Sequence, residues 1–383
     1  THWSKGWVIE DNTIRYSVCT GVTLGKYGDE WDNRAQSATG YVGTINRALD
    51  NGWSKENIGH HVVRNNHISH CEQAGIVGSL GPVFSIITGN TIHDIHVRQL
   101  FGGAEMAGIK LHAAIDTLIA SNHIYRTHRG IWLDWMAQGA RVTGNLLHDN
   151  GGGFDLFLEV NHGPMMIDNN LFLSDLNLLD MSQGGAFIHN LFTGQIAPRP
   201  ELRRETPYHK SHSTEVAGLH NIPGGDHRFY NNSFAGGNGL IPYDNAAFPV
   251  RMEGNVFLAA ARPAKSETDA IVLPEAKPKV KLSETPKGVM LEIAIDRSWT
   301  GGERPLVTTD LLGKSRIAGL SYEQPGGAPY RIDTDYFGRD RKAENPFPGP
   351  FEGTWKDRQR TLKVWPIATP VRQSRCHQRS GGR

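Results

Sequence analysis

Two carboxylates lie in unusually apolar surroundings near the middle of the chain. Asp134 lies in the run IWLDWM, and Glu159 lies in the run FLEVNH. Burying a carboxylate costs free energy, so such a group is rare in apolar sequence unless it has a partner or a task. Two carboxylates facing an aromatic groove are the arrangement of a glycosidase: one attacks or stabilises the sugar and the other protonates the leaving oxygen.

Several neighbouring residues are candidate substrate contacts. Glu105 precedes a predicted strand and could bind sugar hydroxyls, although a loop carboxylate in solvent is the alternative. Asp155 competes with Glu159 as the partner of Asp134. The other candidates could line the groove, stack on a sugar or orient a carboxylate, or could serve in packing or solvation: Lys110, His112, Trp132, Trp135 and His162.

A short repeat predicts the scaffold that must position these residues. From residue 9 to residue 257 the chain repeats an apolar residue, two residues, Asn, one residue and an apolar residue, and the closest copies are 20 to 25 residues apart. This period is typical of a solenoid. Two or three short strands per coil with polar corners predict an all-β fold, a right-handed parallel β-helix. We expect one stacked internal ladder of turn-satisfying amides: Asn12, Asn66, Asn90, Asn122, Asn145, Asn170, Asn190, Asn232 and Asn255.

Aligning the coils on Gly108, Gly130 and Gly153 predicts which side chains share a face. Alternate residues of a strand point the same way. One face is then predicted to hold Lys110, His112, Trp132, Asp134, Asp155, Phe157 and Glu159.

In this alignment Asp134 and Glu159 are diagonal neighbours, with Cα atoms about 8 Å apart. That spacing leaves both stereochemical outcomes open: a carboxyl gap of about 5–5.5 Å indicates retention and about 6.5–9.5 Å indicates inversion. We prefer Glu159 to Asp155 as the acid, because its apolar neighbours would raise its pKa.

Three insertions interrupt the repeat, over residues 26–58, 95–107 and 195–226. Long loops on a rigid scaffold often carry binding function. We expect the first and third insertions to wall a groove.

The organisation predicted from these patterns has three parts. A catalytic β-helix spans residues 1–261, a C-terminal β-strand region over 262–366 caps its last coil, and a polar tail over 367–383 is disordered. Because the first residues, from Thr1 to Ile14, already have the pattern of the middle of a repeat, we expect an N-terminal part of the natural protein to precede Thr1.

Composition argues against several other classes of protein. A net charge of +1 with no basic stripe gives no electrostatic surface for nucleic acid, and no apolar run approaches the length of a membrane span. Cys19, Cys71 and Cys376 are too sparse for a disulfide framework or a zinc site. No glycine-rich nucleotide motif or zinc-protease motif occurs, so no cofactor and no metal ion is expected.

Sparse cysteines slightly favour the cytoplasm over a secreted or periplasmic location, and a homo-oligomer is compatible with the sequence.

Three motifs, in order along this ladder, carry a family resemblance. They are GIKLHAAID at 108–116, GIWLDWMAQG at 130–139 and DLFLEVNHGP at 155–164. In this combination the chain resembles glycoside hydrolase family 120, which comprises β-xylosidases built on a right-handed parallel β-helix with a β-sandwich element. The resemblance covers residues 1–260 and the segment DYFGRDRKAENPFPGPF at 335–351.

The resemblance implies a retaining β-xylosidase acting on a small carbohydrate, a xylo-oligosaccharide. Asp134 would match the nucleophile and Glu159 the general acid/base. Glu105 and His162 would match substrate-contacting or supporting positions. Members of the family are longer at the N-terminus than this chain.

Two other functions fit the same scaffold. A polysaccharide lyase would need a Lys or Arg base on the groove face, for which Lys110 is the candidate, and usually an acidic cluster for Ca²⁺. A non-catalytic carbohydrate-binding solenoid would not require two carboxylates in apolar surroundings.

Overall fold

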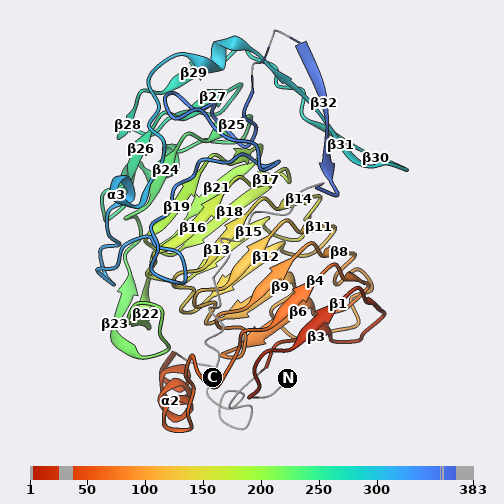
Figure 1. Ribbon diagram of the computed structural model, residues 1–383, viewed down its shortest axis with the longest axis vertical. Coiled ribbons are helices and arrows are strands. Elements are labelled where there is room, and N and C mark those ends of the chain that lie inside the picture. The colour runs from red at the N-terminus through yellow and green to blue at the C-terminus, as the bar shows by residue number, and fades with distance from the viewer. Residues whose placement is uncertain (1–2, 26–37, 354, 356–357, 368–383) are drawn as a thin grey trace, which may run out of the picture.

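The chain winds into a parallel β-helix, shown in Figure 1. The computed structural model describes residues 3–25, 38–353, 355 and 358–367. Three parallel sheets run along the helix, and each coil contributes one strand to each sheet over most of its length. Among the described residues, no helix is long and apolar enough to cross a membrane.

The first two sheets have ten strands each. One consists of β1 (Val8–Glu10), β4 (Val62–Arg64), β7 (Ile86–Thr88), β10 (Leu118–Ala120), β13 (Arg141–Thr143), β16 (Met165–Asp168), β19 (Gly185–Ile188), β24 (Arg228–Tyr230), β26 (Arg251–Glu253) and β28 (Glu267–Thr268). The other consists of β2 (Thr13–Arg15), β5 (His67–Ser69), β8 (Thr91–His93), β11 (His123–Tyr125), β14 (Leu146–His148), β17 (Leu171–Phe172), β20 (Leu191–Phe192), β25 (Ser233–Phe234), β27 (Val256–Leu258) and β29 (Ile271–Leu273).

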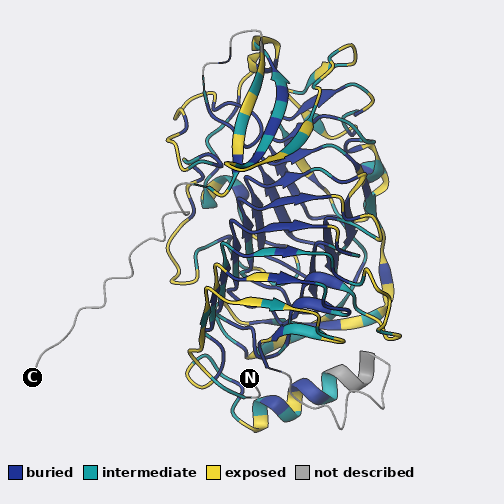
Figure 2. Cartoon of the chain, turned by 90° about the vertical axis from the view of Figure 1, so that its right-hand side faces the viewer, coloured by how far each residue is buried: buried dark blue, intermediate teal, exposed yellow. Residues whose placement is uncertain are grey.

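The third sheet has seven strands and carries the candidate site. Its strands are β3 (Thr20–Thr23), β6 (Ala74–Ser79), β9 (Ala107–His112), β12 (Ile131–Asp134), β15 (Leu156–Glu159), β18 (Leu176–Met181) and β21 (Gln195–Pro198). Inward-facing aliphatic residues of these strands, such as Ile109, Leu133 and Leu158, are fully buried in one core that fills the bore. The strands of the middle coils are almost entirely buried, as the dark blue in Figure 2 shows.

The predicted asparagine ladder is present along the corner between the first two sheets. Each Asn from Asn12 to Asn232 donates from Nδ2 to Oδ1 of the Asn in the next coil, at 2.9–3.0 Å. The same Oδ1 atoms accept the backbone N–H of the preceding ladder residue, as between Asn122 N and Asn145 Oδ1 at 2.9 Å. The ladder therefore pairs buried turn groups that would otherwise lack partners. It ends where Asn255 donates to Glu267.

The β-helix continues past Ala261, where its sequence repeat stops. β28 pairs with β26, and β29 pairs with β27, so the last coil reaches Leu273. The predicted boundary is therefore too early. The Asn pattern ends there because a glutamate, Glu267, takes the ladder position.

The C-terminal region packs along the flank of the β-helix, which differs from the expected cap on its last coil. A three-stranded antiparallel sheet of β30 (Lys281–Thr285), β31 (Gly288–Ile295) and β32 (Arg358–Trp365) covers outward leucines of the second sheet, including Leu146 and Leu171. The segment between β31 and β32, with η2 (Arg297–Thr300) and α3 (Thr309–Leu312), packs against the first sheet. There Tyr322 Oη donates to Gly184 O at 3.0 Å. Residues 368–383 of the predicted tail lie outside the described residues.

Two insertions form separate elements beside the third sheet. The described part of the first contains α2 (Ala38–Asp50), and residues 26–37 lie outside the described part. The third contains the antiparallel hairpin β22 (Glu201–His209) and β23 (Val216–Ile222), and 3₁₀-helix η1 (Ile241–Asn245) follows in a later coil. In Figure 1 the hairpin reaches towards α2.

Candidate active site

Asp134 and Glu159 are directly paired on neighbouring strands of the third sheet. The register aligns His112, Asp134 and Glu159 at the last positions of β9, β12 and β15. Each is followed by a corner residue with positive φ, namely Ala113, Trp135 or Val160. The two Cα atoms are therefore one strand spacing apart, about 4.8 Å, on the same face.

This register corrects the alignment on glycines. Lys110 and Trp132 are paired as expected. On the next strand Trp132 pairs with Phe157 and Ile131 with Leu156. Gly130 is therefore equivalent to Asp155, whereas the alignment had made it equivalent to Gly153. The corner before β15 is two residues longer than the alignment assumed. Asp134 and Glu159 are consequently direct neighbours, and the diagonal geometry was wrong.

Asp155 belongs to that longer corner. It is fully buried, and its carboxylate accepts hydrogen bonds from Asn150 Nδ2 at 2.8 Å, from Ser174 Oγ and N, and from Asn177 Nδ2 at 3.0 Å. The Asp155 carboxylate oxygens thus link its own corner to the neighbouring corner that holds Ser174 and Asn177. We do not include Asp155 in the proposed site.

Asp134 lies in a strongly cationic environment although its side chain is almost completely buried. Its Oδ2 lies 2.9 Å from His112 Nε2 and 3.3 Å from Lys110 Nζ. Burial by itself would raise the pKa of Asp134, but the charge of Lys110 and the contact with His112 hold this pKa below its usual value. Its Oδ1 has no hydrogen-bond partner among the described residues. Asp134 is therefore an ionised carboxylate with one oxygen uncommitted.

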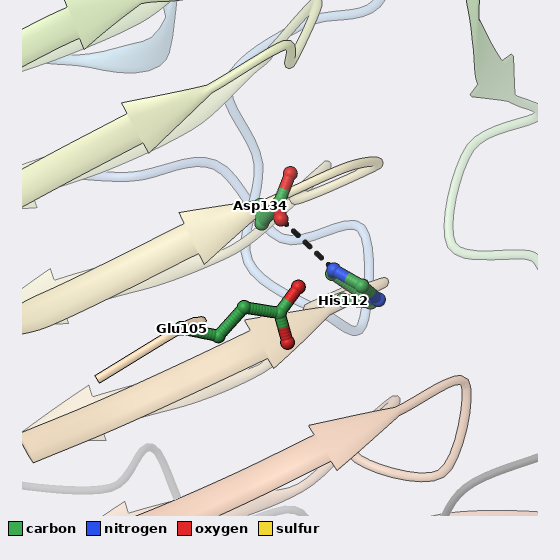
Figure 3. Close-up of side chains that lie close together, drawn as sticks. All are labelled: Glu105, His112 and Asp134. Carbon is green, nitrogen blue, oxygen red and sulfur yellow. Dashed lines mark hydrogen bonds and ion pairs between the residues drawn. The ribbon is translucent and has the colours of Figure 1, made fainter. Parts of the chain in front are cut away.

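Figure 3 shows three side chains that lie close together, Glu105, His112 and Asp134. The ammonium of Lys110 contacts all three of them. These three bring ligand atoms within 4.8 Å of one another, a spacing that suits a metal ion. However, the ammonium of Lys110 lies 3.0 Å from Glu105 Oε1 and 2.5 Å from His112 Nε2. Since this ammonium supplies the positive charge at their centre, we assign no metal site to the group.

Glu159 has a different environment from Asp134. Its Oε2 accepts from Trp132 Nε1 at 3.1 Å, and its Oε1 accepts from the guanidinium of Arg204. Burial, and then the negative charge of Asp134, raise the pKa of Glu159 to about 7, although Arg204 opposes this shift. The pair thus holds one ionised carboxylate beside one carboxyl group that is largely protonated below neutral pH.

The hairpin β22–β23, which lies in the third insertion, packs beside the carboxylate pair. It runs along three successive coils: Thr206 Oγ1 donates to Val160 O, His209 N donates to Gln138 Oε1, and the His212 ring contacts Asp116. These contacts place Arg204 against Glu159.

Two predicted site residues, Trp135 and His162, make contacts with the scaffold. Trp135 is buried at its corner in a cluster with Ile45 of α2 and Val160. The His162 ring bonds to Gln183 and to Thr206 of the hairpin, with His162 Nε2 3.0 Å from Thr206 O. His162 therefore supports the hairpin, because its two ring nitrogens contact Gln183 and Thr206.

Trp132 lies on the same face of β12 as Asp134 and donates a hydrogen bond to Glu159. Its ring is flanked by Lys110 and by Arg129, whose Cζ is 4.6 Å from the ring centroid. Arg129 and Arg204 are site residues that sequence reasoning missed. Arg204 lies inside the third insertion, residues 195–226, which does not follow the repeat. No spacing pattern therefore indicated that its side chain would reach Glu159.

Comparison with known proteins defines the class of this fold. The family model described as the right-handed β-helix region matches residues 2–193, half of the chain, so the chain belongs to the right-handed β-helix family. A comparison with curated proteins found no match.

One similar solved structure is described as "The complex structure of XylC with xylose". It superposes with a TM-score of 0.89 at 36% sequence identity, over 95% of this chain and 62% of that chain. The present chain thus spans less than two thirds of the XylC chain. Together the two findings confirm the predicted fold and the resemblance to glycoside hydrolase family 120.

Proposed function

We propose that this chain is a glycoside hydrolase that removes terminal β-D-xylosyl units from xylo-oligosaccharides with retention of configuration. The observation that carries the proposal is the direct pairing of Asp134 with Glu159, whose pKa values are displaced in opposite directions. Two neighbouring carboxyl groups held in different protonation states are what a retaining glycosidase requires. The likeness to a chain solved with xylose supports the choice of sugar.

In the first step Asp134 attacks the anomeric carbon while Glu159 transfers its proton to the departing oxygen. Lys110 and His112 keep Asp134 ionised, and its unpartnered Oδ1 is the oxygen available for attack. Trp132 and Arg204 fix the Glu159 carboxyl group. In the second step Glu159, now ionised, takes a proton from a water molecule whose oxygen attacks the anomeric carbon. The bond from this carbon to Asp134 breaks, which releases xylose and restores the Asp134 carboxylate.

Direct strand pairing favours retention over inversion. Carboxyl groups on the same face of adjacent strands are separated by about one strand spacing, close to the roughly 5–5.5 Å gap of retaining enzymes. An inverting enzyme needs a wider gap to admit water between the carboxylates.

The lyase alternative is not favoured by the surroundings of Lys110. Its ammonium lies between the carboxylates of Glu105 and Asp134, at 3.0 and 3.3 Å. A lysine held in two ion pairs balances the charge of this cluster, so its contacts are those of a residue that supports Asp134.

The decisive experiment is turnover of an aryl β-xyloside by the purified chain. We expect Asp134→Ala to lower kcat by on the order of 10³-fold or more. Glu159→Ala should be inactive alone but rescued by azide on an activated aryl substrate. Asp149→Ala, at an exposed position in the neighbouring corner, is the matched control.

Proton NMR of the first sugar released reports the stereochemistry, and retention predicts the β-anomer. Near wild-type turnover by Asp134→Ala would refute the assignment of the nucleophile. A folded wild-type chain that turns over no aryl xyloside would favour the binding-only solenoid.

A further inference from the structure

A pair of histidines lies on the outward face of the second sheet, which is a different sheet from that of the carboxylate pair. His67 belongs to β5 and His93 to the next strand, β8, while the adjacent Ile68 and Ile92 point into the core. The Nε2 atoms of the two histidines are 2.6 Å apart. His67 is exposed and His93 is half-buried, so solvent has access to the pair. Imidazole nitrogens that converge from neighbouring strands can serve as ligands of a transition-metal ion.

A neighbouring carboxylate determines which nitrogen of His93 carries the proton. His93 Nδ1 lies 2.6 Å from Asp94 Oδ2. An ionised carboxylate only accepts hydrogen bonds, so the proton is on Nδ1. Burial lowers the pKa of His93, which favours the neutral ring. In this neutral tautomer His93 Nε2 carries the lone pair that a metal ion requires.

The following coil holds both Asp94 and the ring of His93 in place. The guanidinium of Arg126 donates to the two oxygens of Asp94, at 2.7 and 2.9 Å, and these hydrogen bonds lower the pKa of Asp94 to about 2. The ring of Tyr125 on β11 stacks on His93, with centroids 4.9 Å apart and planes 13° apart. A carboxylate that orients a histidine through its second nitrogen is the common outer partner of metal-binding histidines. His93 Nε2 is therefore presented in a fixed direction.

The separation of the two Nε2 atoms favours one coordination geometry. Two imidazole nitrogens that bind one ion at about 2.0 Å are roughly 2.8 Å apart at a right angle and roughly 3.3 Å apart in a tetrahedron. The separation of 2.6 Å is closer to the right angle, which is the angle between neighbouring ligands of square-planar Cu²⁺ and Ni²⁺. Of the divalent ions in this series, Cu²⁺ binds nitrogen ligands most tightly.

A second histidine pair in the next two coils provides an internal comparison. His123 Nε2 and His148 Nε2 are 2.7 Å apart, and His148 Nδ1 lies 2.7 Å from Asp149 Oδ2. Both of these rings are buried, and the ring of Trp365 lies 5.5 Å from that of His123. An ion with only two protein ligands needs water to complete its coordination, and burial denies water to this pair. The exposed pair is therefore the better site.

We propose that His67 and His93 form a Cu²⁺ site in which the two Nε2 atoms are neighbouring ligands and water supplies the others. Within the part of the chain that the structure describes, only Glu105, His112 and Asp134 bring three potential ligand atoms together, so two protein ligands are assigned to the copper site. The ion would join β5 to β8 and so connect two coils. The proposal is independent of the proposed glycosidase function.

The test titrates the full chain with copper(II) sulfate at neutral pH in a buffer that does not bind copper. Since other histidines add weak binding, the site is measured as the difference between wild type and variants. We expect His67→Gln and His93→Gln each to bind one Cu²⁺ fewer per chain by calorimetry. Asp94→Asn keeps both ligands but removes the orienting charge, and should weaken the binding of this ion by about 10- to 100-fold.

Electron paramagnetic resonance gives an independent measure of the ligands. With one equivalent of copper, the wild-type chain should show an axial Cu²⁺ spectrum with coupling to two imidazole nitrogens, and His67→Gln should lose it. His128→Gln is the matched control, because His128 is half-buried and its ring is perpendicular to that of His96, with centroids 6.1 Å apart. This variant should bind copper as the wild type does.

Two results would overturn the copper site. One is an unchanged number of bound ions in His67→Gln, and the other is a wild-type spectrum without coupling to two nitrogens. Circular dichroism of each variant without copper tests its fold. Because the side chain of His67 is exposed, His67→Gln decides the question even if His93→Gln does not fold.

Discussion

Glu159 and Asp134 occupy equivalent positions on adjacent strands, yet different charges surround them. Lys110 and His112 lie against Asp134, whereas Glu159 has one guanidinium, that of Arg204, and the indole of Trp132. The difference in pKa between the two groups therefore comes from side chains on other strands and on an insertion. A mutation of these neighbours should alter the pH dependence before it alters the fold.

The first prediction concerns Arg204. The acid must be protonated, so kcat/KM should fall as the pH rises through the pKa of Glu159, about 7. Because Arg204 lowers this pKa, Arg204→Gln should move the basic limb upward by about one pH unit. The pH profile of kcat/KM on an aryl xyloside measures this limb.

Arg203→Gln is the matched control, since Arg203 is adjacent and its side chain is 90% exposed. An unchanged basic limb in Arg204→Gln would show that Glu159 is not the group that titrates there.

At the scale of elements, each coil depends on the coils before and after it through the asparagine ladder. Asn145 donates to Ile119 O and to Asn170 Oδ1, and it accepts from the backbone and side chain of Asn122. All of these groups are buried away from water.

The second prediction is therefore a large loss of stability in Asn145→Ala. Several buried groups lose their partners, at a cost of roughly 1–3 kcal/mol each, so we expect the free energy of unfolding to fall by about 3 kcal/mol or more. Urea denaturation measures it. Asn12→Ala, at the exposed end of the ladder, should cost much less, and equal losses at both positions would contradict the ladder's role.

The third prediction concerns the carboxyl group that ends the ladder. Burial raises the pKa of Glu267 to about 8, far above its ordinary value of 4.5. The folded chain therefore binds this proton more tightly than the unfolded chain, and the stability that the proton provides is present below pH 4.5 and is lost as the pH rises to about 8.

Replacing Glu267 with Gln, which cannot ionise, should remove this loss. We expect the Tm of Glu267→Gln relative to wild type to increase between pH 5 and pH 8. Glu275→Gln changes the same charge at an exposed position and serves as the control. A Tm difference that does not vary with pH would show that Glu267 does not titrate in this range.

On the scale of the whole molecule, the C-terminal region is held to the flank of the β-helix by buried polar contacts as well as by apolar packing. Arg341 is central to these contacts. Its guanidinium donates to Asn169 Oδ1 at 2.6 Å and to the carbonyls of Phe347 and Gly349 at 3.1 Å, and it lies 3.5 Å from Glu352.

The fourth prediction is that Arg341→Ala loosens this attachment. Removing one member of a buried ionic group costs about 3–5 kcal/mol, so we expect faster amide hydrogen exchange in residues 300–353 while the middle coils stay protected. Arg331→Ala, at an exposed ion pair, is the control. Uniformly faster exchange along the chain would indicate that the flank and the β-helix unfold as one unit.

Local patterns in the sequence were sufficient to predict the scaffold. The Asn period predicted the parallel coils, and the alternation of strands β9 and β12 predicted that Lys110, His112, Trp132 and Asp134 share a face. These features could be predicted because a solenoid repeats the same short-range hydrogen bonds and the same side-chain alternation in every coil.

Tertiary structure alone decided how the site is assembled. The length of the corner at Asp155 set Asp134 directly beside Glu159, and an insertion folded back along the coils to bring Arg204 to Glu159 from 45 residues away. Contacts with the insertions also hold His162 and Trp135. Packing against outward leucines of the second sheet positions the C-terminal antiparallel sheet. Corner length and long-range contacts carry no periodic signal, because each depends on which side chains meet once the coils have stacked.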